Sequence, residues 1–227
     1  MNLKEMAGRR AVEYVEEGMV IGLGTGSTAA YAIKALGERV AEGLQIQAIS
    51  TSEASTQLAT QLGIAMKSFE DETVLDLTID GADEVDPNLN LIKGLGGALL
   101  REKIVAAATT LQIIIVDTSK LVNRLGTRSP LPVEVVPFGW PLAQRHLIQQ
   151  DLRAELRKEA GGDEPIVTDN GNFILDCHFP DGIDDAAGTE RRINAVPSVV
   201  ENGLFVGLTD LVIVAEESGN CRIIERT

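Results

Sequence analysis

Residues 74–117 read VLDLTIDGADEVDPNLNLIKGLGGALLREKIVAAATTLQIIIVD. The first seven residues alternate between apolar and polar side chains, which predicts a strand that ends at Asp80. A helix is expected from about Gly97 to Thr109, and the apolar run at 111–117 then predicts a fully buried strand. Strand, helix and buried strand in this order indicate a parallel sheet that is covered by helices.

Strand-like and helix-like segments also alternate on both sides of this stretch. Short apolar runs at 19–23 and 44–50 predict strands, and a helix is expected between them from about Ser27 to Val40. The apolar run at 210–217 predicts a further strand that returns to the same sheet. We therefore expect an α/β fold with a doubly wound, mostly parallel sheet.

The pattern changes after residue 125. GTRSPLPVEVVPFGWP, residues 126–141, is rich in proline and glycine and predicts a domain boundary. Beyond it we expect a strand, a helix over 141–158, a hairpin whose turn is Asn170-Gly171, and a further helix or turn. This α+β order predicts a smaller domain over 129–200, inserted into a larger domain formed by 1–128 and 201–227.

The composition limits the partners of the protein. Its 20 basic and 34 acidic residues give a formal net charge of −14, and no basic run is present to bind nucleic acid. No apolar run approaches the roughly 20 residues that span a bilayer, so no membrane partner is expected. Residues 1–19 are typical of an amphipathic helix rather than a signal peptide. Cys177 and Cys221 form no CxxC pair, which favours reduced thiols and a cytoplasmic location.

A glycine-rich loop at 22–29 joins the first predicted strand to the following helix. Its glycines allow close backbone approach, and the helix N-terminus with the hydroxyls of Thr25, Ser27 and Thr28 offers hydrogen bonds to a phosphate or sugar. A tight turn in which Ser27 caps the helix is an equally good interpretation. The glycine spacing also fits a dinucleotide site, but the second strand ends at 49–51 without the carboxylate that grips a ribose.

The stretch that begins at Asp80 contains most of the candidate catalytic residues. Asp80 ends a predicted parallel strand, where open α/β sheets bind ligands, and Gly81 permits a turn that brings Asp83 beside it. When two carboxylates are held close together, their pKa values move apart. One of them can then stay protonated as a proton donor while the other accepts a proton. Lys93 precedes the glycine loop 94–97, an arrangement suited to stabilising an oxyanion. An ordinary acidic turn is one alternative, and a calcium-binding loop is another, although the EF-hand pattern is absent.

Glu102 follows in the predicted helix. With Arg101 and Lys103 it forms a charge triplet, and a solvated helix face is the better interpretation from the residues alone. The two histidines, His146 and His178, belong to no cluster with the spacing of metal ligands. Acid–base chemistry would therefore fall to carboxylates and lysine, which is the equipment for moving a proton next to a sugar carbonyl.

Several separated motifs resemble, in the same order, those of the type A ribose-5-phosphate isomerases. In that family a glycine usually stands where this chain has Leu95, and often a threonine where it has Leu100. The matching stretches are Leu3-Lys4, GTGSTA (24–29), DGADEVD (80–86), IKGLGGALLREKI (92–104), VDTSK (116–120), PLPVEVVPF (130–138), TDNGN (168–172) and ENGLFVGLTD (201–210).

The resemblance implies a Rossmann-like main domain with a smaller ferredoxin-like domain, and a homodimer or homotetramer. It implies interconversion of ribose 5-phosphate and ribulose 5-phosphate through an enediolate, in the non-oxidative pentose phosphate pathway. It also implies that the reaction needs no metal and no organic cofactor.

The resemblance further implies a role for each site residue. Glu102 is the base that moves a proton between C1 and C2, while Asp80 and Asp83 handle the hydroxyl protons and ring opening. Lys93 and the loop 94–96 stabilise the enediolate oxygen, and Thr25–Thr28, Lys120 and Lys4 bind the sugar phosphate. The substrate-binding residues implied are Lys4, Thr25, Gly26, Ser27, Thr28, Asp80, Gly81, Ala82, Asp83, Lys93, Gly94, Leu95, Gly96 and Lys120.

Two alternatives stay open. The first is a non-catalytic domain that senses sugar phosphates on the same scaffold, although such a domain could lose Glu102 or Lys93, and both are present. The second is a related amino-sugar phosphate deaminase or CoA transferase, which the motifs do not favour.

Overall fold

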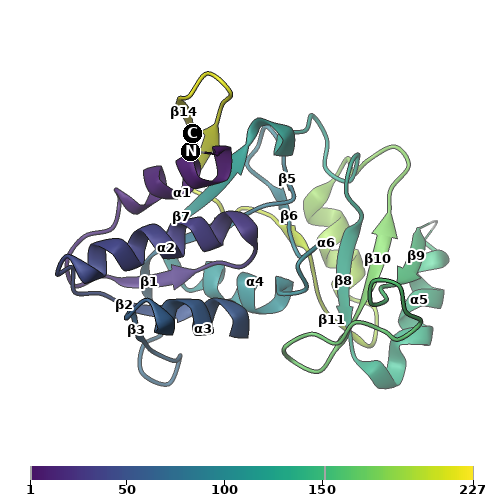
Figure 1. The fold of residues 1–227 in the computed structure, drawn as a ribbon. Coiled ribbons are helices and arrows are strands. Elements are labelled where there is room, and N and C mark those ends of the chain that lie inside the picture. Colours follow the sequence, from purple (N-terminus) through teal and green to yellow (C-terminus); the bar gives the residue numbers. More distant parts are fainter. Residues whose placement is uncertain (1, 151, 227) are drawn as a thin grey trace. The chain divides into compact units, whose positions relative to one another are not determined.

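The computed structural model describes residues 2–150 and 152–226 (Figure 1). Contacts divide the chain into two compact units. The first unit contains the residues up to Ala82, Arg101–Leu121 and the residues from Gly207 onward, and the second contains Asp83–Leu100 and Val122–Val206. This division differs from the expected one of 1–128 with 201–227 against 129–200, because residues 83–100, 122–128 and 201–206 pack within the second unit. The domain boundaries at 128 and 201 stay a prediction.

The first unit is built on a seven-stranded sheet of order β14-β13-β7-β4-β1-β2-β3. All neighbouring strands are parallel except β13 and β14, so the predicted mostly parallel sheet is confirmed. The strand predicted at 210–217 returns to this sheet beside β7. The strands are β1 (Val20–Leu23), β2 (Gln47–Ser50), β3 (Ala65–Met66), β4 (Leu75–Gly81), β7 (Thr109–Asp117), β13 (Leu211–Ala215) and β14 (Cys221–Glu225).

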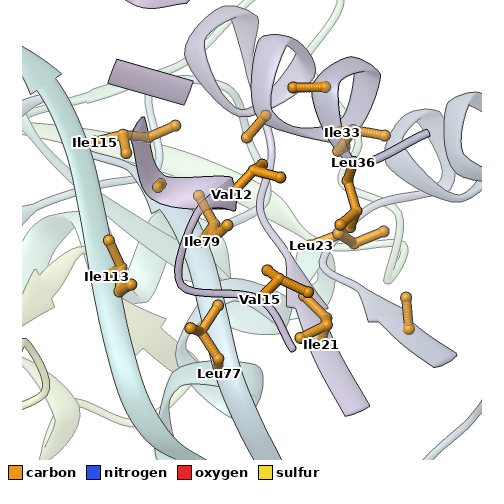
Figure 2. Packing of buried hydrophobic residues seen from close by; sticks show 14 of the residues in the cluster. Val12, Val15, Ile21, Leu23, Ile33, Leu36, Leu77, Ile79, Ile113 and Ile115 are labelled. Atoms are coloured by element: carbon orange, nitrogen blue, oxygen red, sulfur yellow. The ribbon is translucent and has the colours of Figure 1, made fainter. Parts of the chain in front are cut away.

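Helices cover both faces of this sheet. On one face, side chains two apart on the strands pack against α1 and α2 (Figure 2). Ala59 of α3 belongs to the same cluster. On the other face, Val105 of α4 packs against Leu75 and Ile49. The two packed faces explain why all five residues of β13 and residues 113–116 of β7 are apolar and buried. The helices are α1 (Leu3–Val12), α2 (Ser27–Ala41), α3 (Glu53–Gln61) and α4 (Leu99–Ala107).

The strand order places a topological switch point between β1 and β4. From β1 the chain moves outward through β2 to β3, and it then returns to add β4 on the opposite side of β1. Ligands of open α/β sheets bind outside the carboxyl ends of the strands at such a point. The loops that follow Leu23 and Gly81 leave the sheet there.

The second unit contains a four-stranded antiparallel sheet of order β11-β8-β10-β9 with two helices. The chain order is strand, helix, two strands, helix and strand, which is the ferredoxin-like arrangement that was predicted. Its elements are β8 (Leu131–Val135), α5 (Trp140–Ile148), β9 (Arg153–Leu156), β10 (Phe173–His178), α6 (Ala186–Asn194) and β11 (Val199–Asn202). A small sheet of order β12-β6-β5 completes the unit, with β5 (Glu84–Val85), β6 (Leu91–Ile92) and β12 (Leu204–Phe205).

Two local predictions in this unit are wrong. The helix expected over 141–158 ends at Ile148, and residues 153–156 form β9 instead. Pairing with β10 and burial of Ala154 override the helix propensity of this segment. Asn170-Gly171 does lie in a tight turn, but the strands paired with β10 are β8 and β9 rather than the segment just before the turn.

The buried carboxylate of Glu84 holds together the loop that precedes β8. It accepts hydrogen bonds from the backbone N–H groups of Gly126 (2.6 Å), Arg128 (2.8 Å) and Ser129 (2.6 Å). Glu84→Ala leaves these donors without their acceptor, and we expect it to lower the free energy of unfolding by about 3 kcal/mol. Urea unfolding measures the change, with the exposed Glu155→Ala as the control. A loss as small as that of the control would contradict this role.

Candidate functional site

The loop between β1 and α2 is tied to both neighbouring strands. The N–H of Gly24 donates to the carbonyl of Ile79 (3.0 Å), and the N–H of Thr25 donates to Oδ1 of Asp80 (3.1 Å). On the other side, Oγ1 of Thr25 lies 2.7 Å from Oγ1 of Thr51. The sequence analysis did not identify Thr51, because nothing in its local pattern distinguishes it from other hydroxyl residues that follow a strand.

The N-terminus of α2 has no side-chain cap. Gly26 is the N-cap residue, with φ of 97°, and Ser27 is the first residue of the helix, so the interpretation of Ser27 as the cap is wrong. Oγ of Ser27 instead accepts a hydrogen bond from Nζ of Lys4 (2.8 Å). A helix N-terminus without a capping side chain, next to an ammonium group, is a favourable place for an anion.

Asp80 is held in one orientation at the end of β4. Only 1% of the residue is exposed, and its Oδ1 accepts from the N–H groups of both Gly81 (2.7 Å) and Thr25. Hydrogen bonds of this kind offset the cost of burying a charged group. The backbone of Gly24 approaches so closely that a Cβ atom there would lie 2.1 Å from Oδ1 of Asp80. Glycine is therefore required at this position.

Lys120 lies beyond the carboxyl end of a neighbouring strand. It closes the short 3-10 helix η1 (Thr118–Lys120), which follows β7 directly. Because β7 is parallel to β4, with Ile115 opposite Gly81, η1 leaves the sheet at the same edge as Asp80. The first unit thus gathers Thr25–Thr28, Asp80 and Lys120 at the carboxyl edge of its sheet.

The second unit brings Asp83, Lys93 and the following glycine loop together. Lys93 is 2% exposed, its N–H donates to the carbonyl of Gly203 (2.9 Å), and its Nζ lies 5.5 Å from the centroid of the Phe205 ring. The N–H of Leu95 donates to Oδ2 of Asp83 (3.0 Å). Phe205 was not named from the sequence, although it lies inside the family-like stretch 201–210.

The glycine loop tolerates the leucine that it carries. Gly94 and Gly97 have φ values of 101° and 84°, which favour glycine, whereas the described non-glycine residues with positive φ are Leu89 and Ser198. Leu95 is not among them, and 41% of it is exposed. A side chain at this position therefore strains neither the backbone nor the packing.

Glu102 lies in the first turn of α4 and is buried, with 5% of the residue exposed. Lys103 is 9% exposed, whereas Ile104 is 48% exposed and takes the outward position. The interpretation of Glu102 as part of a solvated helix face is therefore wrong. The positive end of a helix favours a carboxylate in its first turn.

The predicted site residues are divided between the two units. Lys4, Thr25–Thr28, Asp80–Ala82, Glu102 and Lys120 belong to the first, and Asp83 with 93–96 to the second. The chain passes from one unit to the other directly after Ala82 and again directly before Arg101. That Asp83 lies beside Asp80 stays a prediction.

A metal site and a reactive thiol each have requirements with which the described residues can be compared. No group of three or more His, Cys, Asp or Glu side chains within 2–150 and 152–226 could hold a metal ion. Burial raises the pKa of the Cys177 thiol to about 12, so this thiol is not a nucleophile at neutral pH.

No helix in the described part of the chain is long and apolar enough to cross a membrane.

The fold and these side chains define an α/β protein equipped for acid–base chemistry with carboxylates and lysine. The sequence model of the family described as ribose 5-phosphate isomerase A (phosphoriboisomerase A) matches residues 47–219. Ribose-5-phosphate isomerase A of Gloeobacter violaceus is 54% identical over 218 residues, which cover 96% of this chain and 94% of that protein. The chain therefore belongs to the ribose-5-phosphate isomerase A family.

Solved structures agree with this assignment. A D-ribose-5-phosphate isomerase in complex with phospho-erythronic acid matches with a TM-score of 0.95 and 44% identity, and the match covers 100% of both chains. Ribose 5-phosphate isomerase A of Methanocaldococcus jannaschii matches with a TM-score of 0.93 and 42% identity over 98% of both chains.

Proposed function

We propose that the protein interconverts D-ribose 5-phosphate and D-ribulose 5-phosphate as an aldose–ketose isomerase of the pentose phosphate pathway. The observation that carries this proposal is the likeness over nearly the whole chain to isomerases of this name, one of which is 54% identical over 96% of the chain. The ligand of one related structure, phospho-erythronic acid, is itself a sugar-acid phosphate.

The reaction moves a proton between C1 and C2 of the open-chain sugar. In the proposed mechanism the Glu102 carboxylate removes the proton from one carbon and returns it to the other, with an enediolate between the two steps. Glu102 suits this task because it is buried, so that bulk water competes less for the transferred proton. Asp80 and Asp83 exchange the hydroxyl protons and assist ring opening.

The negative charge of the enediolate needs a fixed positive partner. Lys93 supplies it, since its ammonium group is buried and held over the ring of Phe205. Charges act more strongly at such a site than in water. The backbone N–H groups of the loop 94–96 add further donors.

The phosphate is assigned to the loop Thr25–Thr28. The N-terminus of α2 has no capping side chain, so its first N–H groups can bind an anion. Lys4 lies within hydrogen-bond distance of Ser27 and adds a positive charge there. Lys120, at the same edge of the sheet, contributes a second positive charge. A protein of net charge −14 depends on such local lysines to attract an anionic substrate.

Turnover of two substrates after exhaustive treatment with EDTA tests the reaction and its metal independence together. We expect ribose 5-phosphate to be isomerised at the untreated rate and glucosamine 6-phosphate to be left unchanged. Deamination of glucosamine 6-phosphate would support the deaminase alternative, and binding without turnover would support the sensor. Loss of activity that a divalent ion restores would contradict the proposed metal-free mechanism.

Gly24→Ala tests the packing of the first loop on Asp80. The new Cβ would lie 2.1 Å from Oδ1 and 2.6 Å from Cα of Asp80, so the aspartate must shift. We expect kcat to fall at least about 10-fold, because a displacement of about 1 Å near the reacting groups is costly. Gly162→Ala is the control, since the nearest atom to its added Cβ is 3.9 Å away. Equal activities of both variants would contradict the role of this contact.

We also propose a homodimer or homotetramer in the cytoplasm, with the sugar phosphate as the ligand and without nucleic acid or a membrane as partner. The family assignment supports the assembly, and the acidic composition supports the exclusion of nucleic acid. Sedimentation velocity at several concentrations distinguishes these oligomers from a monomer.

A further inference from the structure

Arg157 directly follows β9 and forms a largely buried ion pair with Asp176. Its Nε and Nη2 donate to Oδ2 (2.9 Å) and Oδ1 (2.5 Å) of Asp176, a two-pronged contact. The side chains are 11% and 19% exposed, respectively. By contrast, Arg153 at the start of β9 pairs with Glu155 while 73% of its side chain is exposed.

The remaining terminal nitrogen of Arg157 reaches the glycine loop. Its Nη1 donates to the carbonyl oxygens of Gly94 (2.9 Å) and Leu95 (3.0 Å). These are two consecutive peptide groups, 63 and 62 residues away in the sequence. The ion pair with Asp176 uses Nε and Nη2, whereas the contacts to the two carbonyl groups use Nη1. The same guanidinium group therefore binds Asp176 and the glycine loop independently.

Holding the two carbonyl groups also determines where the next N–H groups point. In a trans peptide the C=O and the following N–H point in opposite directions, and the described chain has no cis bond. The Gly94 carbonyl faces Arg157, and the N–H of Leu95 points the other way, to Oδ2 of Asp83 (3.0 Å). By the same rule, the N–H of Gly96 points away from Arg157.

We propose that Arg157, itself held by Asp176, is a positioning residue for the loop 94–97 and for Asp83. It orients the two peptide groups so that their N–H groups serve Asp83 and the enediolate oxygen. The role is geometric, because Asp176 already neutralises its charge. The inference rests on the proposed isomerase function and adds to it a residue that touches neither the substrate nor the reacting atoms.

Three variants test the proposal in one assay of ribose 5-phosphate isomerisation. Arg157→Gln removes the guanidinium group, Arg157→Lys keeps a positive charge without that group, and Arg153→Gln, four residues earlier in β9, is the matched control. A lysine at this position can pair with Asp176 but cannot also span two carbonyl groups. Thermal unfolding shows which variants fold, and Arg157→Lys, which leaves no buried charge unpaired, serves if Arg157→Gln does not fold.

We expect both Arg157 variants to lower kcat by about 10- to 100-fold, with KM changed less than about threefold. Misplaced donors weaken the binding of the transition state more than that of the substrate. The carboxylate of phospho-erythronic acid resembles the pair of enediolate oxygens. Its inhibition constant should therefore rise by about the factor by which kcat falls. Arg153→Gln should match the wild-type protein in all three measurements.

The outcomes separate this inference from the function on which it rests. Wild-type kcat in a folded Arg157→Lys variant would overturn the positioning role, and so would an equal fall in the Arg153→Gln control. A rise in KM alone would likewise overturn it, because the loop would then serve substrate binding only. Absence of turnover by both the wild-type protein and the control would overturn the proposed function itself, and this role with it.

Discussion

Glu102→Gln is expected to lower kcat for ribose 5-phosphate by at least about 10²-fold, the usual scale for loss of a general base. Glutamine has the shape of glutamate and retains hydrogen-bonding atoms, but its amide cannot accept the proton from carbon. Because Glu102 is 5% exposed, the neutral amide also avoids the cost of burying a charge. The fold should therefore remain intact, and KM should change far less than kcat.

A matched control for this variant is Glu53→Gln. Glu53 also lies in the first turn of a helix, α3, but it is exposed. Steady-state kinetics, thermal unfolding and the exchange of the C2 proton of ribose 5-phosphate with solvent deuterium are measured for both variants. Full activity, or undiminished proton exchange, in a folded Glu102→Gln variant would mean that another group is the base.

The second large effect is expected for Lys93→Met, with kcat lowered by about 10²- to 10³-fold, the scale for removing one oxyanion donor. Methionine retains the apolar part of the side chain beside Phe205 and lacks the charge. Lys93 is 2% exposed, and removal of one member of a buried charged contact can destabilise the fold as well. The fall in kcat is therefore determined for the folded fraction of the variant.

Lys158→Met provides the comparison for Lys93→Met. Lys158 pairs with Asp163 at the surface, and 47% of its side chain is exposed. Kinetics and urea unfolding distinguish the two roles that a buried lysine can have. If Lys93→Met unfolded the protein but kept its kcat where folded, Lys93 would be a structural cation and not the partner of the enediolate.

Much of the fold could be predicted from local patterns. The alternation at 74–80 and the apolar run at 111–117 correspond to β4 and β7, because the period of apolar residues reports which faces of an element are buried. The strand β9 was not predicted, because its local pattern does not report the pairing that forms it. Residues 153–156 carry good helix formers, and only pairing with β10 makes them a strand.

The candidate site divides in the same way. The glycine loops, the carboxylates at a strand end and the family could be identified from local sequence, because these depend on residue types at short spacing. The burial of Glu102, the packing of Gly24 on Asp80, and the hydrogen bonds from Arg157 to Gly94 and Leu95 could be found only in the folded structure. Burial and hydrogen-bond partners far apart in the sequence arise from packing of the whole chain, which local periodicity does not encode.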